Sequence, residues 1–239
     1  MRLCGSGAKV KYLLLQHWTG ELNELCRLSM QKNAAYAEQC GADYKLLEGN
    51  VFNPDLCAPV QKMFVLDQSF DEYDVVAMTD MDMFPRQGLK ENLFTDVSGV
   101  GVCDEGNRGK AFARLLEKWP HYSSPKHPFW GGSIYRFERS IRVLLRSQFK
   151  KMEQEWKIWN KKGTPVDEGL MHRCAMLAGL SVKDAYLPDH WSRGHFHPLV
   201  NDARFVHIRK GKRELNGDVI NDTVSKLENY LILNKTGII

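Results

Sequence analysis

The first fifty residues alternate between strand, helix and strand patterns, and this order constrains the fold more than any other feature of the chain. Residues 12–15 (YLLL) form a continuous apolar run, as in a strand that is buried on both faces. Thr19 is a suitable N-cap for a helix that ends at Gly41, and a second strand is expected over Asp43 to Leu47. Because strand–helix–strand units build parallel sheets, we predict an α/β fold with a mostly parallel central sheet flanked by helices.

The remainder of the chain continues this alternation, and its sequence shows neither an internal repeat nor a linker. We expect further strands over residues 74–78, 97–102, 133–137 and 204–208, and further helices over 59–70, 137–159, 167–178 and 219–233. The length of 239 residues suits one large α/β domain. We therefore predict a single domain over residues 1–239.

Composition excludes several classes of protein. Hydrophobic residues make up 43% of the chain and charged residues 26%, which is typical of a globular protein and not of a disordered or fibrous one. No apolar run approaches the roughly 18 to 20 residues that a membrane-spanning helix needs. The apolar stretch over 12–15 is also too short for the core of a signal peptide. We therefore expect a cytoplasmic protein without integral membrane contact, with a bacterial or viral origin as a plausible source.

The net charge of +4 is unevenly distributed along the chain. Residues 1–100 hold 9 basic and 14 acidic residues, whereas residues 101–239 hold 24 and 15. A basic half suits phosphate-bearing ligands, nucleic acid or an anionic membrane surface. The alternative is a solvated surface, because many of these charges fall on one amphipathic helix pattern. Charge alone does not decide between these interpretations.

Asp80 and Asp82 directly follow the apolar strand pattern that ends at Met78. In open α/β sheets, ligands bind beyond the carboxyl ends of the strands, so these carboxylates are expected to face the binding site. Hard divalent cations such as Mg²⁺ and Mn²⁺ bind carboxylate oxygens together with phosphate oxygens and water. A solvated turn is the alternative, but the position at the end of a buried strand favours a metal site.

The segment around this acidic turn, residues 73–85 (YDVVAMTDMDMFP), resembles the Asp-x-Asp region of glycosyltransferases with the GT-A fold. Three further segments resemble that family in the expected order. They are residues 33–47 at the entry to the second strand, the Gly-rich residues 130–137 (WGGSIYRF), and residues 205–212 (FVHIRKGK). The last of these is similar to the His-x-x-x-Gly-Lys motif of glycogenin-like and lipopolysaccharide galactosyltransferase-like enzymes. The resemblance spans about residues 10–213 and implies a single, Rossmann-like GT-A domain.

The resemblance implies a bound Mn²⁺ or Mg²⁺ ion. Asp82 would be its principal ligand, and Asp80 would contact both the ion and the ribose of the donor. His207 would be the third ligand, as a neutral imidazole. We therefore expect these three side chains to meet in the fold, although 125 positions separate Asp82 from His207.

The resemblance also implies how the chain divides its binding roles. A nucleotide-binding part would cover about residues 10–100, an acceptor-binding part about 101–213, and a C-terminal helix about 219–233. Within the donor site, Lys212 would bind the diphosphate and Gly211 would let the backbone approach it. The donor-binding residues that we expect are Gln16, Thr19, Lys62, Asp80, Gly131, Gly132, Gly211 and Lys212. Aromatic and His side chains suit carbohydrate, and the acceptor-binding residues that we expect are Trp130, His190, Trp191 and His195.

Asp167 and Glu168 open the helix pattern over 167–178 and have two interpretations. Acidic residues stabilise helix N-termini through the helix dipole. The resemblance implies instead that Asp167 binds hydroxyl groups of the donor sugar and that Glu168 is the catalytic general base. Both interpretations can hold together. A Glu where glycogenin-like enzymes tend to have Gln slightly favours an inverting reaction.

We therefore expect a metal-dependent glycosyltransferase that moves a sugar from a nucleoside-diphosphate sugar, with a UDP-sugar as the expected donor, to a hydroxyl of a glycan or other acceptor. A nucleotidyltransferase, a non-catalytic carbohydrate-binding module and a haloacid-dehalogenase-like phosphatase are the alternatives. A nucleotidyltransferase would carry a Gly-rich loop after the first strand, whereas Gly5 and Gly7 precede it. A binding module would have no use for Asp80, Asp82 and His207. We expect no nucleic-acid partner, and peripheral membrane association stays open.

Overall fold

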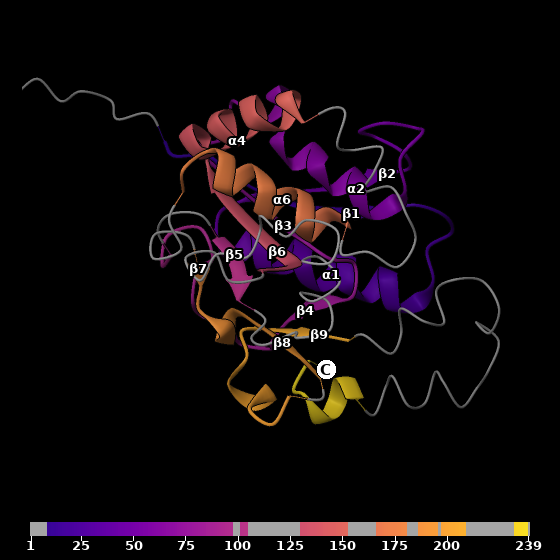
Figure 1. Ribbon diagram of the computed structural model, residues 1–239. Coiled ribbons are helices and arrows are strands. Elements are labelled where there is room, and N and C mark those ends of the chain that lie inside the picture. Colours follow the sequence, from indigo (N-terminus) through magenta and orange to yellow (C-terminus); the bar gives the residue numbers. More distant parts are fainter. Residues whose placement is uncertain are drawn as a thin grey trace, which may run out of the picture.

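A six-stranded sheet forms the centre of the protein, with the strand order β2-β1-β3-β6-β5-β7 (Figure 1). The computed structural model describes residues 9–97, 101–104, 130–152, 166–180, 186–195, 197–208 and 232–238. The strands of this sheet are β1 (Tyr12–Trp18), β2 (Asp43–Glu48), β3 (Val75–Thr79), β5 (Gly101–Asp104), β6 (Trp130–Glu138) and β7 (Tyr186–Leu187). Strand β6 is antiparallel to β3 and β5, and the other strand pairs of the sheet are parallel. The predicted α/β class and the mostly parallel sheet are thus confirmed.

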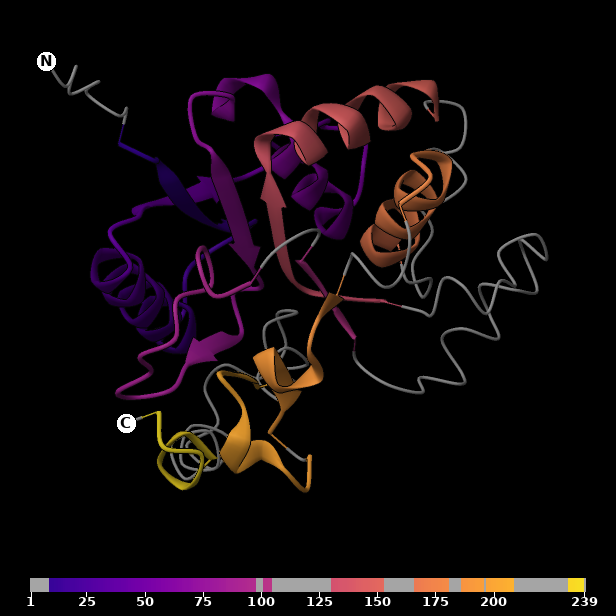
Figure 2. The same cartoon turned by 90° about the vertical axis from the view of Figure 1, so that its left-hand side faces the viewer.

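Alternate residues of the central strands point into two separate hydrophobic clusters, as the period of two in a strand requires. On β1, Leu13 and Leu15 face one cluster and Leu14 faces the other. Helices α4 (Arg139–Lys151) and α6 (Val166–Leu177) pack on the face of Leu13 and Leu15. Helix α1 (Glu24–Gln39) covers the opposite face (Figure 2). The continuous apolar run in β1 is therefore explained by burial on both faces.

Helix α1 begins later than predicted, at Glu24 and not at Thr19. Its N-cap is Asn23, whose side-chain oxygen accepts a hydrogen bond from the backbone N–H of Cys26 at 2.8 Å. The physical reason is Gly20, which has a φ of 102° and therefore cannot lie within a helix. The predicted stop at Gly41 is confirmed, since this residue has a φ of 68°.

The single helix predicted over 59–70 is divided into three short pieces. They are α2 (Ala58–Gln61), the 3-10 helix η1 (Lys62–Leu66) and the 3-10 helix η2 (Gln68–Phe70). Asp67 breaks the helix with an extended backbone and accepts a hydrogen bond from the N–H of Ser69. The tighter η1 segment buries Lys62 and directs it towards the centre of the sheet.

Three arginines of α4 attach this helix to the turn that precedes β3. Arg142 is fully buried and donates hydrogen bonds to the carbonyl groups of Phe70 and Tyr73. Arg139 and Arg146 form ion pairs with acidic side chains of the same turn, at residues 71 and 74. These basic residues, which suggested a ligand-binding or solvated face, thus have structural partners. The remainder of the predicted 137–159 helix beyond residue 152 lies outside the described residues.

A second, three-stranded sheet lies below the carboxyl end of β3 and has the order β4-β9-β8 (Figure 1). Its strands are β4 (Met83–Pro85), β8 (Ser192–Gly194) and β9 (Phe205–His207). Strand β9 confirms the strand predicted near residues 204–208, whereas β8 lies in a segment for which no strand was predicted. The hydroxyl groups of Ser133 and Ser192, 2.8 Å apart, connect the central sheet to this small sheet.

The closing helix predicted over 219–233 lies mostly outside the described residues. Within the described segment 232–238, residues 232–235 are helical. Among the parts of the chain that the structure describes, no helix is long and apolar enough to span a bilayer. The division into nucleotide-binding and acceptor-binding parts stays a prediction.

Candidate active site

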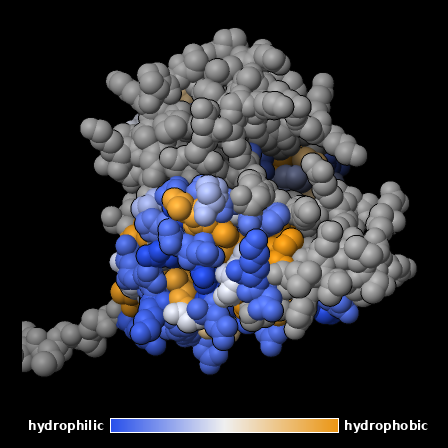
Figure 3. All heavy atoms as spheres, turned by 90° about the horizontal axis from the view of Figure 1, so that it is seen from below, coloured by the Kyte–Doolittle hydropathy of each residue, from blue (hydrophilic) through white to orange (hydrophobic). Residues whose placement is uncertain are grey.

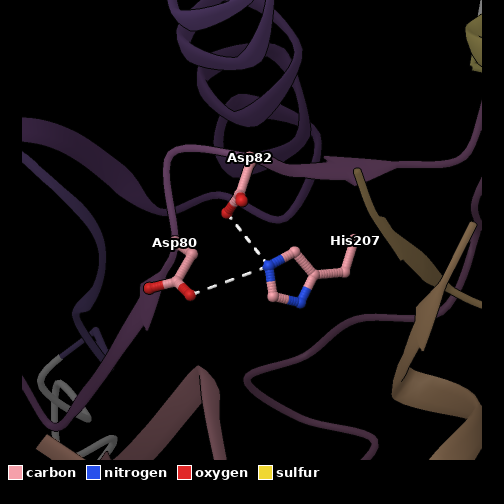
Figure 4. A group of neighbouring side chains, drawn as sticks. All are labelled: Asp80, Asp82 and His207. Carbon is pink, nitrogen blue, oxygen red and sulfur yellow. Dashed lines mark ion pairs between the residues drawn. The ribbon is translucent and has the colours of Figure 1, made fainter. Parts of the chain in front are cut away.

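Asp80, Asp82 and His207 lie together, as predicted, at the carboxyl end of β3 (Figure 4). Nε2 of His207 is 3.1 Å from Oδ1 of Asp82 and 3.9 Å from Oδ2 of Asp80. One ligand atom from each residue lies within 4.8 Å of the others, and all three residues are buried. Ligands of an octahedral ion with bonds of about 2.1 Å are about 3.0 Å apart when adjacent and about 4.2 Å apart when opposite, so both distances lie within this range. The spacing and the chemistry of these oxygen and imidazole donors therefore fit one small divalent cation such as Mg²⁺ or Mn²⁺.

Backbone pairing brings the three ligands together. Strand β4 pairs antiparallel with β9, and Met83 lies opposite His207 in this ladder. The backbone N–H of Ile208 also donates a hydrogen bond to the carbonyl of Asp82 at 2.9 Å. On the other side, the N–H of Asp80 donates to the carbonyl of Ser133 on β6. The turn between β3 and β4 is thus held by both sheets, and this explains how ligands distant in sequence meet.

A buried polar network beneath this turn is the main feature that the sequence analysis missed. From α1, the Ser29 hydroxyl and the Asn33 amide both donate to the carbonyl of Met83, at 3.0 and 2.9 Å. The Thr79 hydroxyl donates to the Asn33 carbonyl oxygen at 3.2 Å. The only signal in the sequence is polar side chains on the inward face of an amphipathic helix. Such side chains need buried partners, which a single sequence does not identify.

Lys62 forms the centre of a second cluster next to the three candidate metal ligands. Its ammonium group is 2.7 Å from Oδ1 of Asp80, forms an ion pair with Asp167, and donates to the carbonyl of Gly132 at 2.9 Å. The side chain is only 11% exposed. Burial disfavours the charged amine, but the two carboxylates outweigh it and raise the pKa of Lys62. The lysine thus stays charged and connects the acidic turn to the start of α6.

Asp167 and Glu168 occupy the first turn of α6 and face β6. Oε1 of Glu168 accepts a hydrogen bond from the backbone N–H of Gly132 at 3.1 Å, and the hydroxyl of Tyr135 donates to Asp167 at 3.2 Å. Burial, followed by the negative charge of Asp167, raises the pKa of Glu168 to about 7. A carboxyl group that titrates near neutrality is suited to general acid–base chemistry.

Gly132 allows this close approach because it has no side chain. A Cβ atom at this position would lie 2.5 Å from Oδ2 of Asp167 and 2.8 Å from the Tyr135 hydroxyl. It would also lie 2.8 Å from Cγ of Glu168. At this position of the Gly-rich segment, a larger residue would collide with the side chains of Asp167 and Glu168 on α6.

The fold has a counterpart among known structures. No protein-family model matches the chain, and no curated protein matches it. It is similar to the crystal structure of a glycosyltransferase involved in the glycosylation of the major capsid of PBCV-1, with a TM-score of 0.54 and 12% sequence identity. The match covers 86% of this chain and 98% of that chain. The chain has the fold of a glycosyltransferase. At this identity the likeness establishes the fold, and the chemistry has to be argued from the site.

The remaining residues expected at the donor site have different environments. Gln16 is fully buried, and its amide nitrogen donates to the carbonyl of Asp80 at 3.1 Å. This hydrogen bond supports the turn that carries Asp80 and Asp82. Direct contact of Gln16 with a donor stays a prediction. Thr19 lies in the loop after β1, and Gly131 lies in β6 next to Gly132. Gly211 and Lys212 lie outside the described residues.

The residues expected to bind the acceptor are also placed differently. Trp191 is only 4% exposed and packs in the hydrophobic cluster of Leu14, so its burial gives no support to acceptor contact. His190 is half-buried in the same short helical turn. His195 lies next to the candidate metal ligand His207, because its backbone N–H donates to the carbonyl of His207 at 3.0 Å. Trp130 begins β6. The acceptor roles of these four residues stay predictions.

Proposed function

We propose that this protein is a metal-dependent glycosyltransferase that transfers a sugar from a nucleoside-diphosphate sugar, with a UDP-sugar as the first candidate, to a hydroxyl of a glycan or other acceptor. The observation that carries this proposal is the buried set of Asp80, Asp82 and His207 at the carboxyl end of β3. In a fold shared with a glycosyltransferase, this edge of the sheet is where a nucleotide ligand is expected.

The residues present have distinct roles in such a transfer. Asp80, Asp82 and His207 would hold Mn²⁺ or Mg²⁺, which supplies positive charge against the diphosphate leaving group. Lys62 adds a fixed positive charge beside Asp80. Gly132, which has no side chain, leaves the room that the side chains of Asp167 and Glu168 occupy at the start of α6.

Glu168 is the proposed general base. Its pKa of about 7 lets it be ionised at neutral pH while it remains basic enough to accept a proton from an acceptor hydroxyl. Asp167, held by Lys62 and Tyr135, is proposed to bind hydroxyl groups of the donor sugar. A general base at the acceptor hydroxyl favours an inverting reaction, which we retain as part of the proposal.

The proposal is tested by incubating the protein with a panel of nucleotide-sugars and Mn²⁺ and measuring the released nucleotide. We expect hydrolysis of at least one diphosphate donor, and loss of this activity in Asp82→Asn. Asp202→Asn is the matched control, because Asp202 is an exposed residue that does not belong to the site. Full activity of Asp82→Asn would contradict the assignment of the metal ligands.

The same assay, supplied with other substrates, separates the alternative functions. Release of pyrophosphate from a nucleoside triphosphate in the presence of a sugar phosphate would indicate a nucleotidyltransferase. Release of inorganic phosphate from phosphate monoesters would indicate a phosphatase. Binding of sugars without turnover of any donor would indicate a carbohydrate-binding module. Each of these three results would contradict the proposed glycosyltransferase function.

A further inference from the structure

The small sheet that carries His207 is too short to be stable by itself. Each of its strands, β4, β8 and β9, has three residues, whereas strands of globular proteins usually have five or six. A metal ligand on such a strand needs other contacts to hold its position. The source of these contacts is found on the face of β9 that points away from Asp82.

Side chains alternate along β9, so that His207 points to one side of the strand and the residues that anchor the strand point to the other. Phe205 packs in the cluster that contains Leu14, whereas Val206 and Ile208 point to the opposite side into a third hydrophobic cluster. His207 points with Phe205, because residues two apart share one face of a strand. A shift of β9 by one residue would turn His207 away from Asp82. Burial of Val206 and Ile208 therefore determines the direction of His207.

The third cluster is closed by segment 232–238, which is distant in sequence from the metal ligands. Leu233 and Ile238 are buried in this cluster together with Val206, Ile208 and Phe84. Figures 1 and 2 show the segment beside β8 and β9. From this side of the molecule, the described surface in Figure 3 is mostly hydrophilic with scattered apolar areas, as expected where the apolar side chains point inward.

Backbone contacts fix the position of this segment. Its Gly237 carbonyl accepts a hydrogen bond from the N–H of Gln87 at 3.1 Å, just after β4. Gly237 has a φ of 67°, and a Cβ atom there would lie 3.1 Å from a guanidinium nitrogen of Arg86. Segment 232–238 is therefore fitted closely to the end of β4 as well as to β9.

We infer that segment 232–238 is a positioning element for the metal site, which holds β9 against β4 so that His207 faces Asp82. The hydrogen bond from the Ile208 N–H to the Asp82 carbonyl lies directly between this cluster and the ligand set. Loss of the packing behind Ile208 weakens this bond and moves the imidazole relative to the carboxylates. The inference rests on the proposed function only where it refers to metal binding.

Two pairs of variants test this role. Leu233→Asp places a charge in the third cluster, and Val143→Asp is its control at an exposed position of α4. Gly237→Ala is a milder change, and Gly179→Ala is its control with nearly the same φ, 69°, and no atom within 4 Å of the added Cβ. Hydrogen exchange of the Ile208 amide and the affinity for Mn²⁺, measured by titration, are compared in all four.

We expect the Ile208 amide to exchange at least about tenfold faster in Leu233→Asp and in Gly237→Ala than in their controls, while amides of β1 and β3 stay protected. The affinity for Mn²⁺ should fall by a similar factor. If Leu233→Asp unfolds the whole protein, Gly237→Ala decides. Unchanged exchange at Ile208 would overturn the inference. A wild-type protein that does not bind Mn²⁺ would contradict the proposed function, whereas the exchange result would still decide the role of segment 232–238.

Discussion

Lys62 contacts one oxygen of Asp80, at 2.7 Å, while the other oxygen of the same carboxylate faces His207 at 3.9 Å. Asp80 therefore belongs both to the candidate metal ligands and to the cluster around Asp167. The two groups of acidic residues share one side chain, and Lys62 is the cation that offsets their charge. A change of charge in one of the two groups should consequently affect the stability and the ion binding of the other.

Replacing Lys62 by Met should destabilise the fold by about 3 kcal/mol or more, because it leaves two buried carboxylates without their shared cation. Added Mn²⁺ should restore more stability to this variant than to the wild type, since an ion bound at Asp80 supplies the missing positive charge. The measurement is the free energy of unfolding in urea, with and without Mn²⁺.

Lys11→Met is the matched control for this prediction. Lys11 also forms an ion pair with a carboxylate, Glu72, but both side chains are more than half exposed. Its removal should leave the free energy of unfolding essentially unchanged. Equal effects of the two substitutions would show that the cluster around Lys62 is not important for stability.

Replacing Gly132 by Ala should displace Asp167 and Glu168, because the new methyl group would lie 2.5 to 2.8 Å from their side chains. We expect destabilisation of about 1 to 3 kcal/mol and a loss of donor turnover of about a hundredfold. Gly41→Ala is the control. It is strained by a φ of 68° but has no neighbouring atom within 4 Å. It should lower stability and leave turnover unchanged, and a similar loss of turnover in both variants would contradict a steric role at the site.

Much of the fold could be predicted from the sequence because it depends on local patterns. The apolar run over 12–15 and the stop at Gly41 correspond to β1 and the end of α1. The start of α1 was predicted incorrectly because Thr19 and Asn23 are both good caps, and the conformation of Gly20 decides between them. The helix predicted over 59–70 is interrupted at Asp67, whose side chain accepts a hydrogen bond from the N–H of Ser69, and this break was not predicted.

The candidate site could be predicted only in part. Asp80, Asp82 and His207 were expected together from a resemblance, and the pairing of β4 with β9 brings them together. The burial of Trp191 was not expected, because this aromatic residue was predicted to bind the acceptor. Buried hydrogen bonds of polar residues such as Gln16 depend on distant partners, and a sequence alone does not show these.

Replacing Tyr135 by Phe should lower turnover without affecting Mn²⁺ affinity. The Tyr135 hydroxyl donates to Asp167, and its loss lets this carboxylate move next to Glu168. We expect turnover to fall about tenfold. Tyr36→Phe is the control: Tyr36 is a buried tyrosine whose hydroxyl donates to the carbonyl of Glu91 on the other face of the sheet. It should cost at least as much stability and leave turnover unchanged, so a parallel loss in both variants would assign Tyr135 a purely structural role.

The ionisation of Glu168 should make stability and activity change in opposite directions with pH. Burial and the charge of Asp167 raise the pKa of Glu168 from 4.5 to about 7 in the folded protein. The protonated form thus contributes stability that is fully present below pH 4.5 and is lost as the pH rises through about 7.

The comparison that isolates this effect is wild type against Glu168→Gln, because Gln imitates the protonated carboxyl and does not titrate. In EDTA, the free energy of unfolding of wild type should fall relative to the variant by about 1 to 3 kcal/mol between pH 5 and pH 8. Turnover of wild type with Mn²⁺ should rise over the same range, because only the ionised carboxylate can accept a proton. A constant difference in stability from pH 5 to pH 8 would show that Glu168 is already ionised throughout. A general base with a raised pKa would then be excluded at this position, and Glu168 would be left with its role as the acceptor of the Gly132 N–H.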